Sequence, residues 1–148
     1  MKTSTVLLVD DNPDHVELAR RSLEDVSSKT CIRHVRDGRQ ALAYLRGLAP
    51  YDDRKENPFP DLVFLDLHLP EIGGLALLGR MKANRMLRSL PVVVLTSSAC
   101  RDDILTAYNL QANGYLVKPG DYTEFERMLK VAGQYWLDWN HQPGPEEK

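Results

Sequence analysis

Five polar residues stand at the ends of short apolar runs, and together they carry the groups that bind metal ions and phosphate. They are Asp10, Asp11, Asp66, Thr96 and Lys118. Most have an ordinary explanation when taken singly: an aspartate after a strand often caps a helix, a threonine often ends a strand, and a lysine is usually solvated. Asp66 is harder to explain, because it ends a fully apolar run and is followed by another leucine, where an isolated carboxylate would be costly to bury.

Brought together, these side chains would form an acidic site that needs a cation. Two like charges about 4 Å apart repel by about 4 kcal/mol at an effective dielectric constant near 20, so clustered carboxylates must be compensated. Oxygen ligands without a histidine or cysteine cluster favour Mg²⁺, which binds one or two carboxylates and keeps water or phosphate oxygens. The lysine adds a second positive charge, and a carboxylate can act as a nucleophile. The set therefore suits phosphoryl transfer to an aspartate.

Strands and helices alternate along the chain in a way that would gather the set. The apolar, β-branched runs that we expect to be strands are Val6–Val9, Thr30–Val35, Leu62–Leu65, Val92–Leu95 and Tyr115–Val117. Helical patterns follow each of them; Asn12 caps the first and Asp37 the second, and the fifth runs from about Asp121 to Trp139. Five such pairs predict an α/β, flavodoxin-like (βα)5 fold, a five-stranded parallel sheet of order 2-1-3-4-5 with helices on both faces. Strands one and three are neighbours in that order, so the three aspartates should converge.

Composition indicates one ordinary globular domain. The 148 residues are 43% hydrophobic and 27% charged, which argues against a disordered chain. The net charge of −2 and the isoelectric point near 6.1 lack the basic footprint of a nucleic-acid-binding domain. No run approaches the roughly 18 apolar residues that span a membrane, and Cys31 and Cys100 fit neither a metal spacing nor a disulfide framework. We expect a cytoplasmic protein with free thiols and with no nucleic-acid or membrane partner.

Several segments, taken as a set, resemble the receiver domain of two-component response regulators. They are Val6–Asn12, Asp37-Gly38 with Ala41-Leu42, Asp61–Pro70, Gly74, Pro91–Thr96, Gly114-Tyr115 and Lys118-Pro119, which together span about residues 4–140. The long stretch before the third strand, the segment 92–98 and the aromatic end of the last helix look most like the single-domain regulators that partner cyanobacterial and bacterial phytochrome kinases. On this resemblance, residues 1–140 would be the receiver domain and 141–148 a polar tail.

The resemblance implies a phosphorylation site with a bound cation. Asp66 would accept a phosphoryl group from a phosphohistidine of a sensor histidine kinase. Asp11 and Asp66 would ligate Mg²⁺ directly, together with the backbone carbonyl of His68, and Asp10 would act through a water. Lys118 would pair with Asp66 and then with a phosphate oxygen.

The resemblance also implies a conformational switch. Thr96 would turn its hydroxyl toward the phosphate, and Tyr115 would move into the space that this opens. The Lys118–Pro119 bond would be cis, a form nearly confined to X–Pro bonds. His68 and Ser98, two residues beyond Asp66 and Thr96, would tune dephosphorylation. The resulting prediction is a phospho-accepting signalling protein that catalyses only its own phosphorylation and dephosphorylation.

Three other functions stay open at this stage. The fold could serve as an interaction module that is not phosphorylated. A phosphohydrolase with an aspartyl nucleophile would usually carry a second acid where this chain has His68. A flavin carrier of the same topology would favour Gly, Ser or Thr after the first strand, where this chain has Asp10-Asp11-Asn12.

Two remaining features concern partners. Only 30 residues follow Lys118, so we expect no attached output domain, and output through contact with a downstream protein that the sequence does not identify. Tyr135, Trp136 and Trp139 give the last helix more aromatic surface than one stripe needs, so they either cover the sheet edge or form a homodimer contact. The Gly47–Pro60 connection is long and charged, which is typical of a solvated loop or of a functional one.

Overall fold

The computed structural model of the chain describes residues 3–27 and 29–143, and the predicted sheet is confirmed. The strands are β1 (Ser4–Val9), β2 (Thr30–Val35), β3 (Leu62–Leu65), β4 (Val92–Thr96) and β5 (Gly114–Val117). All neighbouring pairs are parallel, in the order β2-β1-β3-β4-β5. The helices are α1 (Pro13–Val26), α2 (Gly38–Arg46), α3 (Gly74–Ala83), α4 (Arg101–Asn109) and α5 (Tyr122–Gly133), and α5 continues as a π-helical segment, η1 (Gln134–Trp139).

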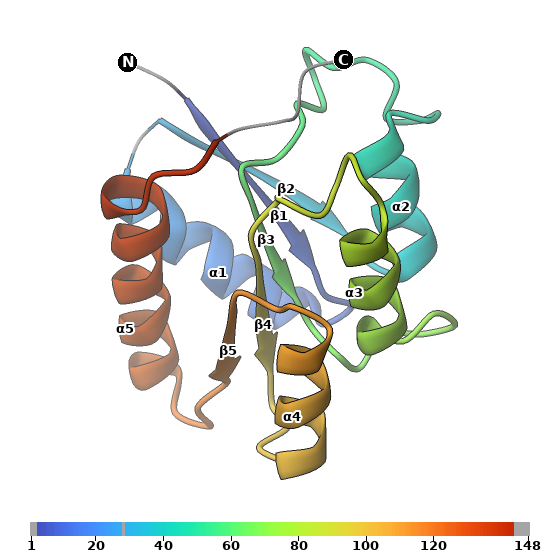
Figure 1. Ribbon diagram of the computed structural model, residues 1–148. Coiled ribbons are helices and arrows are strands. Elements are labelled where there is room, and N and C mark those ends of the chain that lie inside the picture. Colours follow the sequence, from blue (N-terminus) through green and yellow to red (C-terminus); the bar gives the residue numbers. More distant parts are fainter. Residues whose placement is uncertain (1–2, 28, 144–148) are drawn as a thin grey trace.

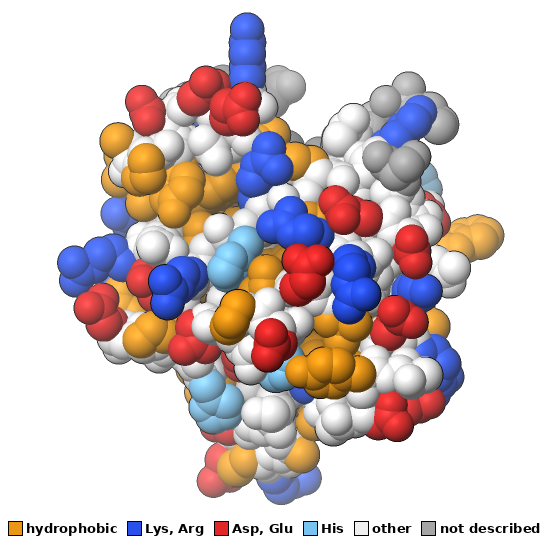
Figure 2. Space-filling view, turned by 180° about the vertical axis from the view of Figure 1, so that it is seen from behind, with side chains coloured by type: hydrophobic (Ala, Val, Ile, Leu, Met, Phe, Trp, Pro, Cys, Tyr) orange, Lys and Arg blue, Asp and Glu red, His pale blue; other side chains and the backbone are white. Residues whose placement is uncertain are grey.

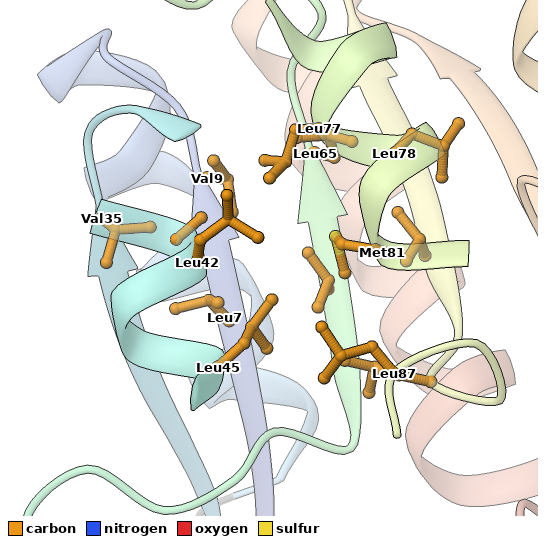
Figure 3. Packing of buried hydrophobic residues seen from close by; sticks show 14 of the residues in the cluster. Leu7, Val9, Val35, Leu42, Leu45, Leu65, Leu77, Leu78, Met81 and Leu87 are labelled. Atoms are coloured by element: carbon orange, nitrogen blue, oxygen red, sulfur yellow. The ribbon is translucent and has the colours of Figure 1, made fainter. Parts of the chain in front are cut away.

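Helices cover both faces of the sheet, α1 and α5 on one side and α2, α3 and α4 on the other (Figure 1). Successive side chains of a strand point to opposite faces, so each nearly continuous apolar run feeds two cores. One core joins alternate residues of β1 and β3 to α2 and α3 (Figure 3). The other joins the remaining strand residues to α1 and α5. The central strands are thereby buried on both faces, as their composition predicted.

Side-chain caps fix where the helices begin at the carboxyl edge of the sheet. The Asn12 side chain accepts hydrogen bonds from the backbone N–H groups of Asp14 and His15, at 3.0 and 3.3 Å. Asp37 accepts from the backbone N–H of Gln40 at 2.8 Å. Because these caps hold the first turns of α1 and α2, the loops that follow β1 and β2 have defined paths.

The Gly47–Pro60 connection is a packed loop at the amino edge of the sheet, opposite the carboxyl ends of the strands (Figure 1). The Arg54 guanidinium donates to the backbone carbonyls of Tyr44, Leu45 and Asn57, at 2.8, 2.9 and 3.1 Å. The Tyr44 hydroxyl donates to the carbonyl of Pro58 at 2.8 Å. The loop's charged residues at 52, 53, 55 and 56 are exposed, as a solvated loop predicts, but these anchors tie its backbone to α2.

The structure also bears on the expectations about membrane-spanning segments and about the two cysteines. Within residues 3–27 and 29–143, no helix is long and apolar enough to cross a membrane. Both cysteines are free thiols, Cys31 half-buried and Cys100 exposed. Residues 144–148 of the expected polar tail lie outside the described residues.

Candidate functional site

The carboxyl edge of the sheet gathers the predicted acidic set. Asp10 and Asp66 are buried and Asp11 is exposed, and one carboxylate oxygen from each lies within 4.8 Å of the others. Nζ of Lys118 is 2.7 Å from Oδ2 of Asp10 and 3.1 Å from Oδ2 of Asp66. Among the described residues, these three aspartates are the cluster that could hold a metal ion.

Sheet register explains why residues so far apart in sequence meet. Val9 pairs with Leu65, so Asp10 and Asp66 emerge side by side, and the N–H of Asp66 donates to the carbonyl of Val9 at 2.9 Å. Thr96 ends β4, and its carbonyl accepts from the N–H of Lys118 at 2.7 Å. Backbone hydrogen bonds of the sheet therefore place each of these residues.

Burial and neighbouring charges set the electrostatics at Asp10. Burial raises the pKa of the Asp10 carboxyl above its usual value, and the nearby charge of Asp66 acts in the same direction. The hydrogen bonds from Lys118 and from the Asn12 N–H oppose this rise. Since the carboxylate form of Asp10 is disfavoured by its surroundings, an added cation would be well accommodated beside it.

A histidine that the sequence did not indicate also belongs to the site. Nδ1 of His15, in the first turn of α1, lies 2.9 Å from Nζ of Lys118. Its sequence position could have indicated this, because His15 precedes the buried residues Leu18 and Ala19 by one helical turn and so lies on the inward face of α1. A second histidine, His34 of β2, supports the backbone: its Nε2 lies 2.7 Å from the carbonyl of Asp10.

The expected switch residues form a connected group beside the acidic set. Thr96 is fully buried, and its Oγ1 lies 3.5 Å from the backbone N–H of Ser98. The Ser98 hydroxyl donates to Oδ2 of Asp103 in α4 at 2.6 Å. The hydroxyl of half-buried Tyr115 donates to the backbone carbonyl of Ser98 at 2.9 Å, and burial raises its pKa. Ser98 thus connects Thr96, Tyr115 and α4, a role that its sequence position did not reveal.

His68 is placed next to the expected phosphoacceptor. Its backbone N–H donates to Oδ1 of Asp66 at 3.2 Å, and its side chain is exposed. Asp66 therefore has one oxygen bonded to a backbone N–H and the other to Lys118.

The prediction of a cis peptide bond at Lys118–Pro119 is wrong. In the described chain the cis X–Pro bond is Ala49–Pro50, in the packed loop after α2. The trans form of an X–Pro bond is favoured by about 0.5–1 kcal/mol, so the presence of Pro119 does not by itself make the bond cis.

The aromatic residues of η1 separate into two groups. Trp136 is half-buried and packs on the core shared by α1 and α5. Tyr135 and Trp139 are 53% and 78% exposed. Trp136 therefore covers the core, and Tyr135 and Trp139 face outward, where the homodimer contact stays a prediction.

Comparison with known proteins agrees with this geometry. The model of the response regulator receiver domain matches residues 6–130. The probable methanogenesis regulatory protein FilR2 of Methanothrix harundinacea is 39% identical over 95% of this chain and 88% of that protein. Response regulator Rcp1 of Synechocystis is 33% identical over 90% of this chain and 88% of that protein.

Solved structures give the same result. The phosphorylated cyanobacterial phytochrome response regulator RcpA superposes with a TM-score of 0.91 at 32% identity, covering 97% of this chain and all of that one. The Mn²⁺-bound form of Rcp1 superposes with a TM-score of 0.88 at 32% identity, covering 95% and 99%. By sequence and by structure, the chain belongs to the receiver-domain family of response regulators.

Proposed function

We propose that the protein accepts a phosphoryl group on Asp66 from a sensor histidine kinase and passes the signal on through its own surface. The observation that carries this proposal is the ammonium of Lys118, held between the buried carboxylates of Asp10 and Asp66. An uncompensated pair of buried carboxylates would be costly, and a cation at this position can later pair with a phosphate oxygen. The protein then catalyses only its own phosphorylation and dephosphorylation.

Mg²⁺ is the cation that fits the site best. Asp10, Asp11 and Asp66 offer carboxylate oxygens, and the backbone carbonyl of His68 would complete the ligand set. Such hard oxygen ligands suit Mg²⁺ or Mn²⁺, and the Mn²⁺-bound form of Rcp1 is a relative that holds a divalent ion. When bound, the ion would offset the negative charge of the phosphoryl oxygens.

The residues of the chain account for the transfer itself. An oxygen of Asp66 forms a bond to phosphorus while the bond between phosphorus and the kinase's histidine nitrogen breaks, and the electron pair leaves with the nitrogen. Lys118 keeps its charge within reach of the new phosphoryl oxygens, and the buried Thr96 hydroxyl supplies a donor. Positioning and charge compensation of this kind are the main contributions of proteins to phosphoryl transfer.

Labelling with a small phosphodonor tests the proposal. Acetyl phosphate with Mg²⁺ should add one phosphoryl group to the wild type, seen by intact mass, and none to Asp66→Asn. The bond should be cleaved by hydroxylamine, as an acyl phosphate is. Equal labelling of Asp66→Asn would remove Asp66 as the acceptor.

The switch would run through the group around Ser98. Movement of Thr96 toward a phosphate would disturb the hydrogen bond from Tyr115 to the Ser98 carbonyl and the bond from Ser98 to Asp103, so β5 and α4 would rearrange. The result is a population shift between two surface conformations. We also assign to His68 and Ser98 a role in setting the phosphate lifetime, measured as the rate of label loss in His68→Ala and Ser98→Ala.

A phytochrome-type kinase is the partner that the relatives favour. RcpA is a cyanobacterial phytochrome response regulator, and another solved relative, of 28% identity and TM-score 0.86, acts in red light signalling of R. palustris. FilR2, by contrast, is named as a methanogenesis regulator. Phosphotransfer profiling against the histidine kinases of the host, with phytochrome-type kinases included, decides between these classes by which kinase transfers fastest.

The exposed aromatic residues of η1 support a homodimer. Tyr135 lines an apolar groove with Met128 and Val131 of α5. Trp139 is exposed further along η1, and exposed apolar surface of this kind marks interfaces. Light scattering should give a dimer for the wild type and a lower mass for Trp139→Ala. Tyr108→Ala on α4, which removes an aromatic ring that is 50% exposed, is the matched control and should stay dimeric. Monomeric wild type and Trp139→Ala of equal mass would refute the dimer.

A further inference from the structure

Lys118 has a hydrogen-bond partner to which the proposed reaction gives no role. Its ammonium carries three N–H donors and no acceptor. Asp10, Asp66 and His15 offer three acceptor atoms, at 2.7, 3.1 and 2.9 Å. The Lys118 side chain is only 4% exposed, so water cannot readily replace a partner that is lost. His15 therefore completes the hydrogen bonding of the ammonium.

The contact fixes the state of the imidazole. Because an ammonium only donates, Nδ1 of His15 must accept, which places the ring proton on Nε2 and keeps the ring neutral. Burial lowers the pKa of His15, and the charge of Lys118 lowers it further, while the carboxylates of Asp10, Asp66 and Asp14 act in the opposite direction and are outweighed. The other tautomer would let Asn12 donate to Nε2 across 3.5 Å, but it would point a proton at the ammonium.

Two helices hold the ring in place. The backbone N–H of His15 donates to the side chain of Asn12, the cap of α1. The ring packs edge-to-face against Phe125 of α5 at a centroid distance of 5.5 Å and approaches Tyr122 at 6.5 Å. The Nδ1 atom is thus carried by packed elements that lie outside the loop bearing Lys118.

We propose that His15 is a positioning residue that holds the Lys118 ammonium at the site while the carboxylates beside it change their bonding. This role rests on the proposed function. Transfer to Asp66 turns an ionised carboxylate into an acyl phosphate, and the oxygen bonded to phosphorus becomes a much weaker acceptor. A neutral imidazole keeps the same acceptor strength before and after transfer, so it retains the ammonium where the new phosphoryl oxygens appear.

A crossed pair of variants separates this role from simple packing. His15→Phe keeps a ring against Phe125 and removes the acceptor. His15→Asn loses the ring but places an amide oxygen where Nδ1 stood. At saturating Mg²⁺, His15→Phe should be labelled by acetyl phosphate about five- to tenfold more slowly than the wild type, which corresponds to about 1–1.4 kcal/mol and lies within the roughly 0.5–1.5 kcal/mol that a typical hydrogen bond contributes. His15→Asn should retain the rate within about threefold.

A faster labelling rate in His15→Phe than in His15→Asn would overturn the proposal, because a packing role predicts that His15→Phe is the milder change. Thermal unfolding of both variants reports packing separately from rate. Long-range ¹H–¹⁵N NMR spectra of the metal-free wild type give a readout that needs no phosphorylation, and they should show the proton of His15 on Nε2. A proton on Nδ1 would overturn the contact itself. Failure of the wild type to be labelled would instead reject the proposed function, and with it the part of His15 in transfer.

Discussion

Gly74, the first residue of α3, lies where the backbone approaches the end of β3 too closely for a side chain. A Cβ added there would lie 2.4 Å from the backbone oxygen of Asp66 and 2.5 Å from Cα of Leu67. The N–H of Gly74 donates to the carbonyl of Leu67 at 3.0 Å. This hydrogen bond holds the start of α3 against the end of β3 and leaves no room for a side chain at position 74. Both atoms belong to the backbone of Asp66, the proposed phosphoacceptor, and of Leu67 after it, so no side-chain rotation relieves the clash.

The size of the effect follows from the overlap. Ordinary contacts of a Cβ begin at about 3.4 Å, so α3 and the end of β3 would have to separate by about 1 Å in Gly74→Ala. Overpacking of this kind costs about 1–3 kcal/mol and occasionally more, and the rigid backbone on both sides places this variant at about 3 kcal/mol. For a chain of this size that lowers the unfolding temperature by roughly 6–12 °C. A displacement of Asp66 by about 1 Å would slow its phosphorylation by about 100-fold.

Gly73→Ala is the matched control, because a Cβ at Gly73 meets no atom within 4 Å and its φ of −65° suits any residue. Its unfolding free energy should stay within about 1 kcal/mol of the wild type. The assay compares thermal unfolding and the rate of labelling by acetyl phosphate in the two variants and the wild type. If Gly74→Ala unfolds at the same temperature as Gly73→Ala and is labelled as fast, the close approach does not constrain the site.

Three further predictions concern other parts of the structure. Burial raises the pKa of Tyr44 to about 12 from its usual 10, so the stability it contributes is complete below pH 10 and is lost as the pH rises toward 12. In urea unfolding at pH 8, Tyr44→Phe should be about 1 kcal/mol less stable than the wild type, because it loses the hydrogen bond to the carbonyl of Pro58. This difference in unfolding free energy should disappear by pH 11, and a difference that stays constant would contradict the prediction. Burial also raises the pKa of Asp10, so the stability that this carboxyl contributes is present at acidic pH and is lost as the pH rises. Without metal, the unfolding free energy of Asp10→Asn should therefore rise relative to that of the wild type between pH 4 and pH 7. A fall in this difference would contradict the direction of the pKa shift. Ser98→Ala removes the bond to Asp103, so amide hydrogen exchange over residues 98–103 should speed up by about tenfold, whereas unchanged exchange would show that the bond does not hold the loop.

The parts of the molecule that follow from local sequence could be predicted. A run such as Leu62–Leu65 has no polar residue to place outside, so it fits only a strand covered on both faces. Asn12 and Asp37 are residues that satisfy the free N–H groups of a first helical turn, and both act as caps. Once the strand order is known, the register places Asp10 beside Asp66, which is why the acidic set was predicted with its lysine.

Features that depend on the rotation and packing of helices were beyond the sequence. The spacing of α1 places His15 on the inward face of the helix, but it does not show that the ring reaches Lys118 or that Phe125 of α5 supports it. The π-helical segment at the end of α5 adds a residue to its turn, which breaks the regular stripe and separates half-buried Trp136 from exposed Trp139. A periodic pattern read at 3.6 residues per turn cannot make that distinction.

The net charge of the chain is concentrated at the candidate site. The chain carries a net charge of −2, and Asp10, Asp11, Asp66 and Lys118 together carry the same charge, so the other acidic and basic residues balance. On the face seen in Figure 2 the two signs are intermixed. The excess negative charge therefore lies at the site, where it would attract a divalent cation.

In the surrounding solvent the electric field of the site falls off over about 8 Å at physiological ionic strength. A phosphoryl group on Asp66 would change the charge locally, but distant surfaces such as the one around Trp139 would not sense it directly. The change must travel as movement, and the connected hydrogen bonds of Ser98 with Tyr115 and Asp103 give it a path into β5 and α4. Weakening that path in Ser98→Ala should therefore alter the response of the surface to phosphorylation even where labelling of Asp66 is unchanged.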